Sequence, residues 1–250
     1  MESDPIIHHA LLAIDAGNTR IKWGVGDRGR WVATGAVESA RSDRIAEAWA
    51  GLPPIERAVA SNVAGAGVER DLLRACESRG IRLDVFAARA EQLGVVNGYR
   101  DPRQLGSDRW AALVAAHALG GGNKLVVNVG TALTADALAA DGRFLGGIIV
   151  PGPGLMARSL GEGTAGLPLA KGEFADFPAT TADAIATGAL HACIGAIVRM
   201  GDAMAGRGLA PERVVISGGA AQRIAALLPI PFAIHENLVL DGLALMARNS

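Results

Sequence analysis

The chain has 250 residues, of which 50% are hydrophobic and 20% charged, and its formal net charge is -1. This much apolar material supports a buried core and excludes disorder of the whole chain, which requires low hydrophobicity and high net charge. The balanced charge also shows no basic face of the kind that a general nucleic-acid binder carries, so no nucleic-acid partner is expected.

The first half of the chain predicts the element order βββαβαβ. Short apolar runs and turn residues predict strands at 11–15, 21–25, 31–37, 58–61 and 83–87, and helices at about 42–50 and 68–78. Ser42 is expected to cap the first of these helices, since a serine side chain accepts a hydrogen bond from a free N–H at a helix start. The turn between the second and third strands is expected at Gly-Asp-Arg-Gly, residues 26–29.

The second half repeats this order. Strands are predicted at 125–129, 134–138, 144–150, 214–217 and 232–235, and helices near 154–160, 181–205, 221–228 and 240–248. A spacing of three to four residues predicts that the longest helix buries Ile185, Ala189, Ala192, Ala196 and Met200. The most apolar stretch of that helix, 184–198, is interrupted by polar residues and is expected to be too short to span a bilayer.

The two cysteines, Cys76 and Cys193, predict buried free thiols rather than a disulfide framework. The first residues lack a basic region followed by a long apolar core, so no signal peptide is predicted. We therefore expect a soluble protein of the reducing cytoplasm that has no membrane partner.

The repeated order predicts an α/β fold of two duplicated ribonuclease-H-like halves, the actin-like ATPase architecture, with a ligand cleft between them. A helix near 107–119 is expected to join the halves. Residues 1–115 form the predicted N-terminal half, which carries a first phosphate loop. Residues 116–250 form the predicted C-terminal half, which carries a second phosphate loop and a Gly-Gly motif for adenosine.

The first phosphate loop is Asp-Ala-Gly-Asn-Thr-Arg-Ile-Lys at 15–22. Asp15 ends a buried strand, where a carboxylate is costly unless it faces a cleft, a cation or hydrogen-bond donors. Gly17 permits a tight turn whose N–H groups can point at phosphate oxygens, and Thr19 and Lys22 can add further contacts to the same phosphates. The alternative is an ordinary β-hairpin in which the aspartate and the asparagine only form the turn.

The second loop, Asn-Val-Gly-Thr-Ala-Leu-Thr-Ala-Asp at 128–136, has the equivalent place in the second half. Two such turns can grip a triphosphate from both sides, and the alternative is a duplicated hairpin without a ligand. A third motif, at 214–221, ends a buried strand in Gly-Gly before a helix, so that a flat group can pack on bare backbone. Its alternative is a plain strand-to-helix turn.

The fourth motif is Gly-Ser-Asp-Arg at 106–109, at the start of the joining helix. Asp108 is either a capping acid, favoured by the helix dipole, or a carboxylate that accepts a proton from a substrate hydroxyl. Arg109 can hold a substrate carboxylate through a forked pair of hydrogen bonds.

Motifs of several other enzyme classes are missing from the sequence. The histidines lack metal-site spacing, and His191, on the apolar helix, is expected to be a core residue rather than a ligand. The chain has no Walker motif, no dinucleotide-binding glycine motif after a strand and no nucleophile elbow.

In their order along the chain, six motifs resemble those of type III pantothenate kinases. They are 15–22, Tyr99 followed by Leu-Gly-Ser-Asp-Arg at 105–109, 128–136, Gly-Gly-Ile-Ile-Val-Pro-Gly at 146–152, Thr-Thr-Ala-Asp-Ala-Ile-Ala-Thr-Gly at 180–188, and Val-Ile-Ser-Gly-Gly at 215–219. Each motif alone is weak, whereas six in the right order are specific. The resemblance runs from about residue 11 to residue 245.

The resemblance implies a kinase of the acetate and sugar kinase, Hsp70 and actin superfamily, usually a homodimer. It implies transfer of the γ-phosphoryl group of Mg²⁺-bound ATP to the primary hydroxyl of pantothenate, the first step toward coenzyme A. Asp108 would accept the proton. The resemblance assigns ATP binding to Asp15, Ala16, Gly17, Asn18, Thr19, Arg20, Ile21, Lys22 and Thr131. It assigns the pantothenate site to Tyr99, Gly106, Ser107, Asp108, Arg109 and Thr181.

Asn128 departs from the family pattern. Many members carry an aspartate at this position, and that aspartate is associated with a bound K⁺ ion. Asparagine keeps a carbonyl oxygen but loses the charge, so a K⁺ or NH₄⁺ ion would be held less tightly here.

Two other functions fit parts of the sequence. One is a kinase of the same fold that acts on a sugar or a carboxylate, which the short chain disfavours. The other is a nucleotide-binding accessory protein that acts through a partner, a label attached to some relatives. The set of Asp15, Asp108, Arg109 and Thr131 counts against it, because a pure binding module needs no base.

Overall fold

The computed structural model describes residues 10–27, 29–163 and 172–249, which form two compact units. The first unit comprises the described residues of Met1–Leu93, Asp101–Ala115 and Val239–Ser250, and the second those of Gly94–Arg100 and Ala116–Leu238. The expected halves, 1–115 and 116–250, differ from these units in two segments: 94–100 lies in the second unit, and the C-terminal segment lies in the first.

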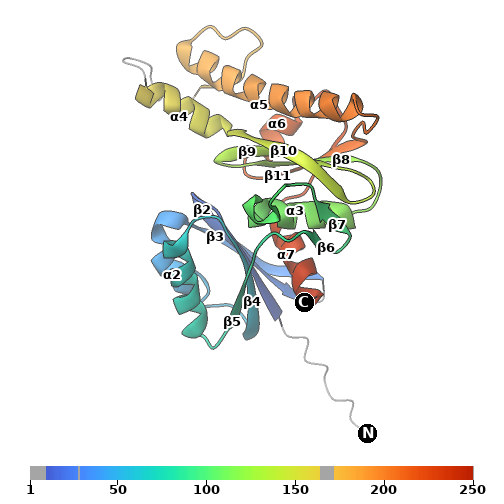
Figure 1. The fold of residues 1–250 in the computed structure, drawn as a ribbon. Helices are drawn as coiled ribbons and strands as arrows, with labels where there is room; N and C mark the ends of the chain where they lie inside the picture. Colours follow the sequence, from blue (N-terminus) through green and yellow to red (C-terminus); the bar gives the residue numbers. More distant parts are fainter. Residues whose placement is uncertain (1–9, 28, 164–171, 250) are drawn as a thin grey trace. The chain divides into compact units, whose positions relative to one another are not determined.

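The first unit is built on a five-stranded sheet (Figure 1). Its strands are β1 (Ala10–Ala16), β2 (Arg20–Asp27), β3 (Arg30–Glu38), β4 (Ile55–Asn62) and β5 (Arg82–Phe86). They lie in the order β3-β2-β1-β4-β5; the β1–β2 and β2–β3 pairs are antiparallel and the β1–β4 and β4–β5 pairs parallel. The five predicted strands are confirmed, and one residue of the predicted 26–29 turn, Arg28, lies outside the described residues.

Helices cover both faces of this sheet (Figure 1). They are η1 (Ser39–Arg44), α1 (Ile45–Ala48), α2 (Ala66–Glu77), η2 (Pro102–Gln104), α3 (Ser107–Ala118) and α7 (Leu238–Arg248). On one face, Leu72 of α2 and Ile14 of β1 belong to one buried apolar cluster. On the other face, the Trp31 indole of β3 donates a 2.7 Å hydrogen bond to Asp241 Oδ1 of α7. Because both faces are covered, the central strands β1 and β4 are apolar on both sides.

The predicted helix at 42–50 is replaced by two shorter pieces. Residues 39–44 form the 3₁₀ helix η1, and only 45–48 are α-helical. Ser42 does not cap a helix; its hydroxyl donates a 2.6 Å hydrogen bond to Asp71 Oδ2 of α2. The prediction that Ser42 caps a helix is therefore wrong, because its hydroxyl is bonded to a side chain of another helix instead.

The second unit repeats the strand order of the first. Its strands are β7 (Val95–Asn97), β8 (Lys124–Val129), β9 (Ala132–Leu138), β10 (Arg143–Pro151), β11 (Arg213–Ser217) and β12 (Phe232–Ile234). The sheet has the order β12-β11-β8-β9-β10-β7-β6, and its short edge strand β6 (Glu91–Gln92) consists of residues of the first unit. Read from β10 to β12, this is the same 3-2-1-4-5 arrangement with the same pairing directions. The predicted duplication is confirmed, whereas β6 and β7, at one edge, were not predicted.

The helices of the second unit are α4 (Pro153–Gly163), α5 (Thr181–Ala205) and α6 (Ala221–Ala225). The buried residues of α5 include Leu190, Cys193, Ile197, Gly201 and Met204. Of the predicted buried face, only Ala189 is buried, so that prediction is wrong. The spacing of small alanines does not distinguish neighbouring faces of so apolar a helix, and the larger side chains select the face that meets the sheet.

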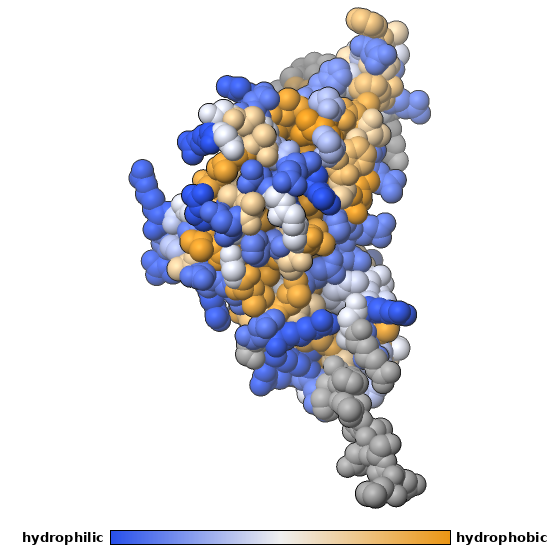
Figure 2. All heavy atoms as spheres, turned by 90° about the vertical axis from the view of Figure 1, so that its right-hand side faces the viewer, coloured by the Kyte–Doolittle hydropathy of each residue, from blue (hydrophilic) through white to orange (hydrophobic). Residues whose placement is uncertain are grey.

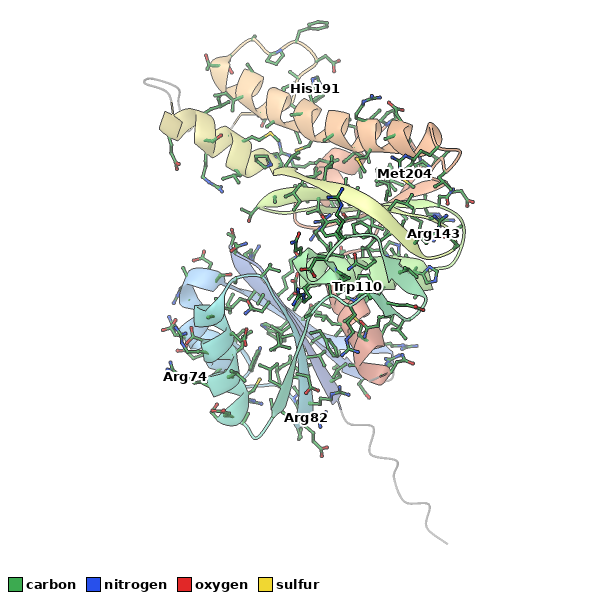
Figure 3. The ribbon with its side chains drawn as sticks, in the orientation of Figure 1. Arg74, Arg82, Trp110, Arg143, His191 and Met204 are labelled. Carbon is green, nitrogen blue, oxygen red and sulfur yellow. The ribbon has the colours of Figure 1, made fainter. Side chains whose placement is uncertain are left out.

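α5 also corrects two further expectations. It has 25 residues and is long and apolar enough, by length and composition, to cross a membrane, so the argument that it is too short is wrong. This is weak evidence for a span, since the core helix of a soluble protein has the same properties. His191, labelled on α5 in Figure 3, is exposed rather than buried, and it meets the Phe174 ring edge-on at 5.8 Å.

On the face drawn in Figure 2, hydrophobic and hydrophilic residues are interspersed.

Candidate active site

The first phosphate loop is the connection between β1 and β2. Asp15 of β1 pairs directly with Lys22 of the antiparallel strand β2, which puts their side chains on the same face of the sheet. The turn is closed by a 3.1 Å hydrogen bond from Gly17 N to the Arg20 carbonyl. The residues at its tip, Asn18 and Thr19, are exposed. The tip of the loop therefore lies at the surface of the first unit.

Asp15 is a carboxyl group in an unfavourable position. Its pKa is raised to about 7: burial raises it most, the charge of Asp108 raises it as well, and the charge of Lys22 lowers it. Asp15 also lies beside Ser61 in the parallel pairing of β1 with β4. The first unit thus brings the first and fourth predicted motifs within electrostatic reach of one another.

The fourth motif forms the start of α3. Ser107, its first residue, shares a 2.8 Å hydrogen bond with Ser61 at the end of β4, and both side chains are buried. Sequence reasoning missed Ser61, because nothing near it in the chain indicates that it meets a residue 46 positions away. Further along α3, a Cβ at Gly242 of α7 would lie 1.9 Å from the Ala111 carbonyl oxygen, so only glycine permits this close approach of the two helices.

The Asp108 side chain accepts a hydrogen bond from the backbone of its own helix. Its Oδ1 accepts a 2.8 Å hydrogen bond from the N–H of Arg109, as expected for a capping acid. Burial raises the pKa of Asp108, while this N–H and the Arg109 charge lower it. A Cβ at Gly106 would lie 2.6 Å from the same Oδ1, so glycine leaves room for the carboxylate.

The second phosphate loop connects β8 with β9 in the second unit. Its turn is closed by a 2.9 Å hydrogen bond from Gly130 N to the Ala132 carbonyl. Gly152 N donates a second hydrogen bond, of 2.8 Å, to the Thr131 carbonyl. Thr131 itself is exposed. The loop has the same form as the first, as the duplication predicts.

The Gly-Gly motif packs against this second loop. Gly218 has φ +103°, and a Cβ there would lie 2.3 Å from the Val129 carbonyl oxygen and 2.7 Å from Asn128 Oδ1. The next residues turn back, and Ala220 N donates a 3.2 Å hydrogen bond to the same Val129 carbonyl. The bare backbone that was predicted here is therefore required by the fold of the second unit itself.

The remaining predicted residues, Tyr99 and Thr181, lie on separate elements of the second unit. The Tyr99 ring packs against Phe144, with 5.4 Å between centroids, and its N–H donates a 3.0 Å hydrogen bond to Asn97 Oδ1. Thr181 is the exposed first residue of α5, preceded by the N-cap Thr180.

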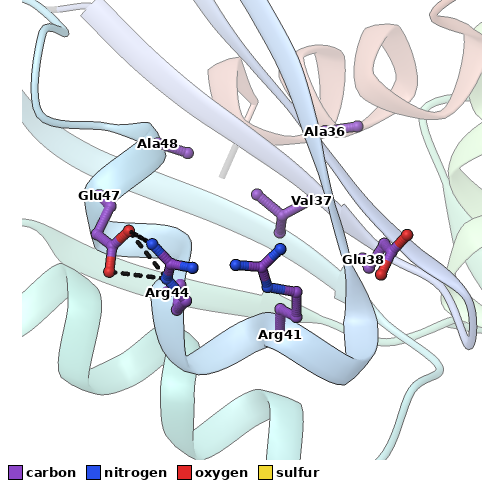
Figure 4. Close-up of a pocket in the computed structure, with 7 residues that line it drawn as sticks. All are labelled: Ala36, Val37, Glu38, Arg41, Arg44, Glu47 and Ala48. Atoms are coloured by element: carbon purple, nitrogen blue, oxygen red, sulfur yellow. Dashed lines mark hydrogen bonds and ion pairs between the residues drawn. The ribbon is translucent and has the colours of Figure 1, made fainter.

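A surface pocket of about 350 Å³ lies beside η1 (Figure 4). Its lining includes the charged residues Glu38, Arg41, Arg44 and Glu47, and the Arg44 and Glu47 side chains are paired with each other. Two acids and two bases give it no net charge, and none of the predicted site residues line it. Among residues 10–27, 29–163 and 172–249, no group of three or more His, Cys, Asp or Glu side chains is placed to hold a metal ion.

The fold matches that of solved proteins. Solved structures of similar fold include ethanolamine utilization protein EutJ from Carboxydothermus hydrogenoformans, with a TM-score of 0.58, 14% identity and coverage of 97% of this chain and 92% of that one. They also include MreB 5 of Spiroplasma citri bound to AMPPNP, with a TM-score of 0.52, 9% identity and coverage of 96% of both chains. These likenesses confirm the actin-like ATPase fold.

Sequence comparison resolves the family within that fold. The model of type III pantothenate kinases matches residues 11–203. A type III pantothenate kinase of Aromatoleum aromaticum is 48% identical over 238 residues, which cover 95% of this chain and 98% of that protein. The resemblance inferred from the six motifs is thereby confirmed, and the chain belongs to the type III pantothenate kinase family.

Proposed function

We propose that the chain transfers the γ-phosphoryl group of ATP to the primary hydroxyl of pantothenate, giving 4'-phosphopantothenate, the first step of coenzyme A biosynthesis. The observation that carries the proposal is that Asp108 lies within electrostatic reach of Asp15 in the phosphate loop, inside the first unit of a chain of this family. Phosphoryl transfer needs positioning and charge neutralisation more than covalent help from the protein, and this group of residues offers both.

ATP binding is assigned to the loop at 15–22 and to Thr131. Asp15 suits a place beside the Mg²⁺ ion that accompanies ATP, because a buried carboxylate near a second acid gains from a cation. When bound, that ion neutralises charge on the phosphate oxygens. Lys22, opposite Asp15, can hold a phosphate oxygen by a charge-assisted hydrogen bond.

Asp108 is assigned the role of proton acceptor. Its raised pKa favours this role, since a base whose pKa lies nearer the working pH takes a proton more readily. Arg109 beside it is assigned to the pantothenate carboxylate, and Tyr99, Gly106, Ser107 and Thr181 to the rest of the pantothenate site.

A homodimer and a cytoplasmic location complete the proposal. The two buried free thiols, Cys76 and Cys193, suit a reducing compartment. A coupled assay of ADP release tests the proposal: pantothenate should support turnover, and a panel of sugars and acetate should not. Turnover with a sugar or acetate in place of pantothenate would move the chain to another kinase of the same fold.

We predict that Asp108→Asn lowers kcat on the order of 10²- to 10⁴-fold, because the amide cannot accept the substrate proton. Binding of Mg·ATP, measured by calorimetry, should remain within a few-fold of wild type. Asp101→Asn, at an exposed acid of the preceding turn, is the matched control and should keep normal kcat. Near-normal turnover in Asp108→Asn would leave that residue as a helix cap only.

Asp15→Asn is predicted to raise stability at pH 8 while it abolishes Mg·ATP-dependent activity. The folded-state pKa of about 7 lies above the ordinary aspartate value of 3.8, so the folded protein binds more protons between these values. The free energy of unfolding of the wild type should therefore fall as pH rises from about 4 to about 7, by on the order of a few kcal/mol. The variant has no such group, so its Tm should exceed that of the wild type at pH 8 while its Mg·ATP-dependent activity is lost.

The Asp15→Asn prediction has one control variant and one outcome that would contradict it. Asp43→Asn, at an exposed position of η1, should leave the pH dependence of Tm unchanged. If Asp15→Asn unfolds at lower temperature than the wild type at pH 8 and keeps its activity per folded molecule, the carboxylate is structural.

Asn128 is proposed to bind K⁺ or NH₄⁺ weakly. Its Oδ1 lies close to Gly218, at 2.7 Å from where a Cβ would be, and hard cations accept neutral amide oxygens of this kind. We expect activation by K⁺ that saturates only at high concentration, and a lower half-activation concentration in Asn128→Asp. Titration of KCl against choline chloride at constant ionic strength measures both. Flat activity in both proteins would remove the ion from the mechanism.

A further inference from the structure

η1 contains two buried serines with the same kind of contact but different partners. Ser39 and Ser42 are 8% and 7% exposed. The Ser42 hydroxyl donates its 2.6 Å hydrogen bond to Asp71 of α2, whereas the Ser39 hydroxyl donates a 2.6 Å hydrogen bond to the Gly17 carbonyl in the first phosphate loop. One serine therefore fastens η1 to a helix, and the other fastens it to the loop.

Ser39 holds the loop at a second point. Its backbone N–H donates a 3.0 Å hydrogen bond to the Thr19 carbonyl. One residue thus takes two of the carbonyl groups of the loop, and both of these carbonyls point toward η1.

The direction of these carbonyls determines where the loop N–H groups point. In a trans peptide the C=O of one residue and the N–H of the next are antiparallel. Because the carbonyls of Gly17 and Thr19 point toward Ser39, the N–H groups of Asn18 and Arg20 point away from it. Backbone N–H groups that face the same side of a loop attract an anion, whereas a carbonyl turned to that side would repel a phosphate oxygen.

The duplicated unit provides an internal comparison. Ser39 follows the last residue of β3, and Gly152 follows the last residue of β10. Both donate their backbone N–H to the threonine carbonyl of the adjacent loop, Thr19 or Thr131. A Cβ at Gly152 would lie 2.2 Å from the Gly130 carbonyl oxygen, so the second loop is held by direct backbone packing. In the first loop the Ser39 hydroxyl adds a side-chain contact to this backbone one.

We propose that Ser39 is a positioning residue for the nucleotide phosphates: its hydroxyl holds the Gly17 carbonyl so that the N–H of Asn18 faces the ligand, and its backbone N–H holds the Thr19 carbonyl so that the N–H of Arg20 does the same. Ser39 touches neither substrate, so its effect passes through the loop. The inference rests on the proposed function to the extent that the loop at 15–22 binds ATP.

The test compares Ser39→Ala with Ser42→Ala, which removes an equally short hydrogen bond from an equally buried serine of the same helix. Since a hydrogen bond of this kind changes an equilibrium by roughly three- to tenfold, KM for ATP should rise by that factor in Ser39→Ala. KM for pantothenate should stay within about twofold. Ser42→Ala should leave both KM values unchanged, although both variants lower Tm. Ser39→Thr, which keeps the hydroxyl, should restore KM for ATP.

Two results would overturn the inference. One is an unchanged KM for ATP in Ser39→Ala, and the other is an equal rise in Ser42→Ala, which would make the effect one of general stability. The affinity of each protein for Mg·ADP, measured by calorimetry, is independent of the second substrate and should weaken only in Ser39→Ala. If the wild type fails to phosphorylate pantothenate, the proposed function fails, and the Mg·ADP affinities still decide the role of Ser39.

Discussion

The first unit contains one costly arrangement, a partly buried carboxylate at the end of a central strand. Asp15 must lie where β1 ends, because the loop that follows begins with Gly17 and cannot be moved without shifting the register against β2. Lys22 offsets part of the cost, but Asp108 adds to it. A chain selected for stability alone would not keep two acids so close, and perturbed carboxyl groups of this kind gather at functional sites. The cost is removed when a cation or a hydrogen-bond donor arrives with a ligand.

Because the fold is duplicated, the chain has two phosphate loops. The two loops differ in charge and in the contacts that hold them, so one cannot replace the other. Both turns are closed by a backbone bond across the loop, and both are held from the residue after the third strand. The first carries Asp15 at the strand end, whereas the second carries the uncharged Asn128. The first is fastened by a hydroxyl and the second by close backbone packing at Gly152. The charged, side-chain-supported loop suits a metal-bound phosphate, and the neutral loop suits a weaker cation or a direct phosphate contact.

Much of this architecture can be predicted from the sequence, because its strands are apolar runs that end at glycine turns, and such signals are local. The order of the ten repeated strands and the position of α3 follow from that pattern. What could not be predicted depends on distant partners. Three hydrogen bonds join segments that lie far apart in the sequence: Ser61 with Ser107, Ser42 with Asp71, and Ser39 with the first phosphate loop. The buried face of α5 was missed for a related reason, since only the sheet beneath it selects among several apolar faces.

Asp108 can serve both as a capping acid and as the catalytic base that we propose. A base must be held in one orientation, and the hydrogen bond from the Arg109 N–H to Oδ1 supplies that orientation. The same bond lowers the pKa of the carboxyl group and so preserves the ionised form that a proton acceptor requires, while burial raises the pKa toward the range in which proton transfer is efficient. Gly106 leaves the space that this orientation needs. The first turn of the helix therefore both stabilises and orients the carboxylate. Loss of this hydrogen bond would disturb the orientation of the proposed base even if its charge remained.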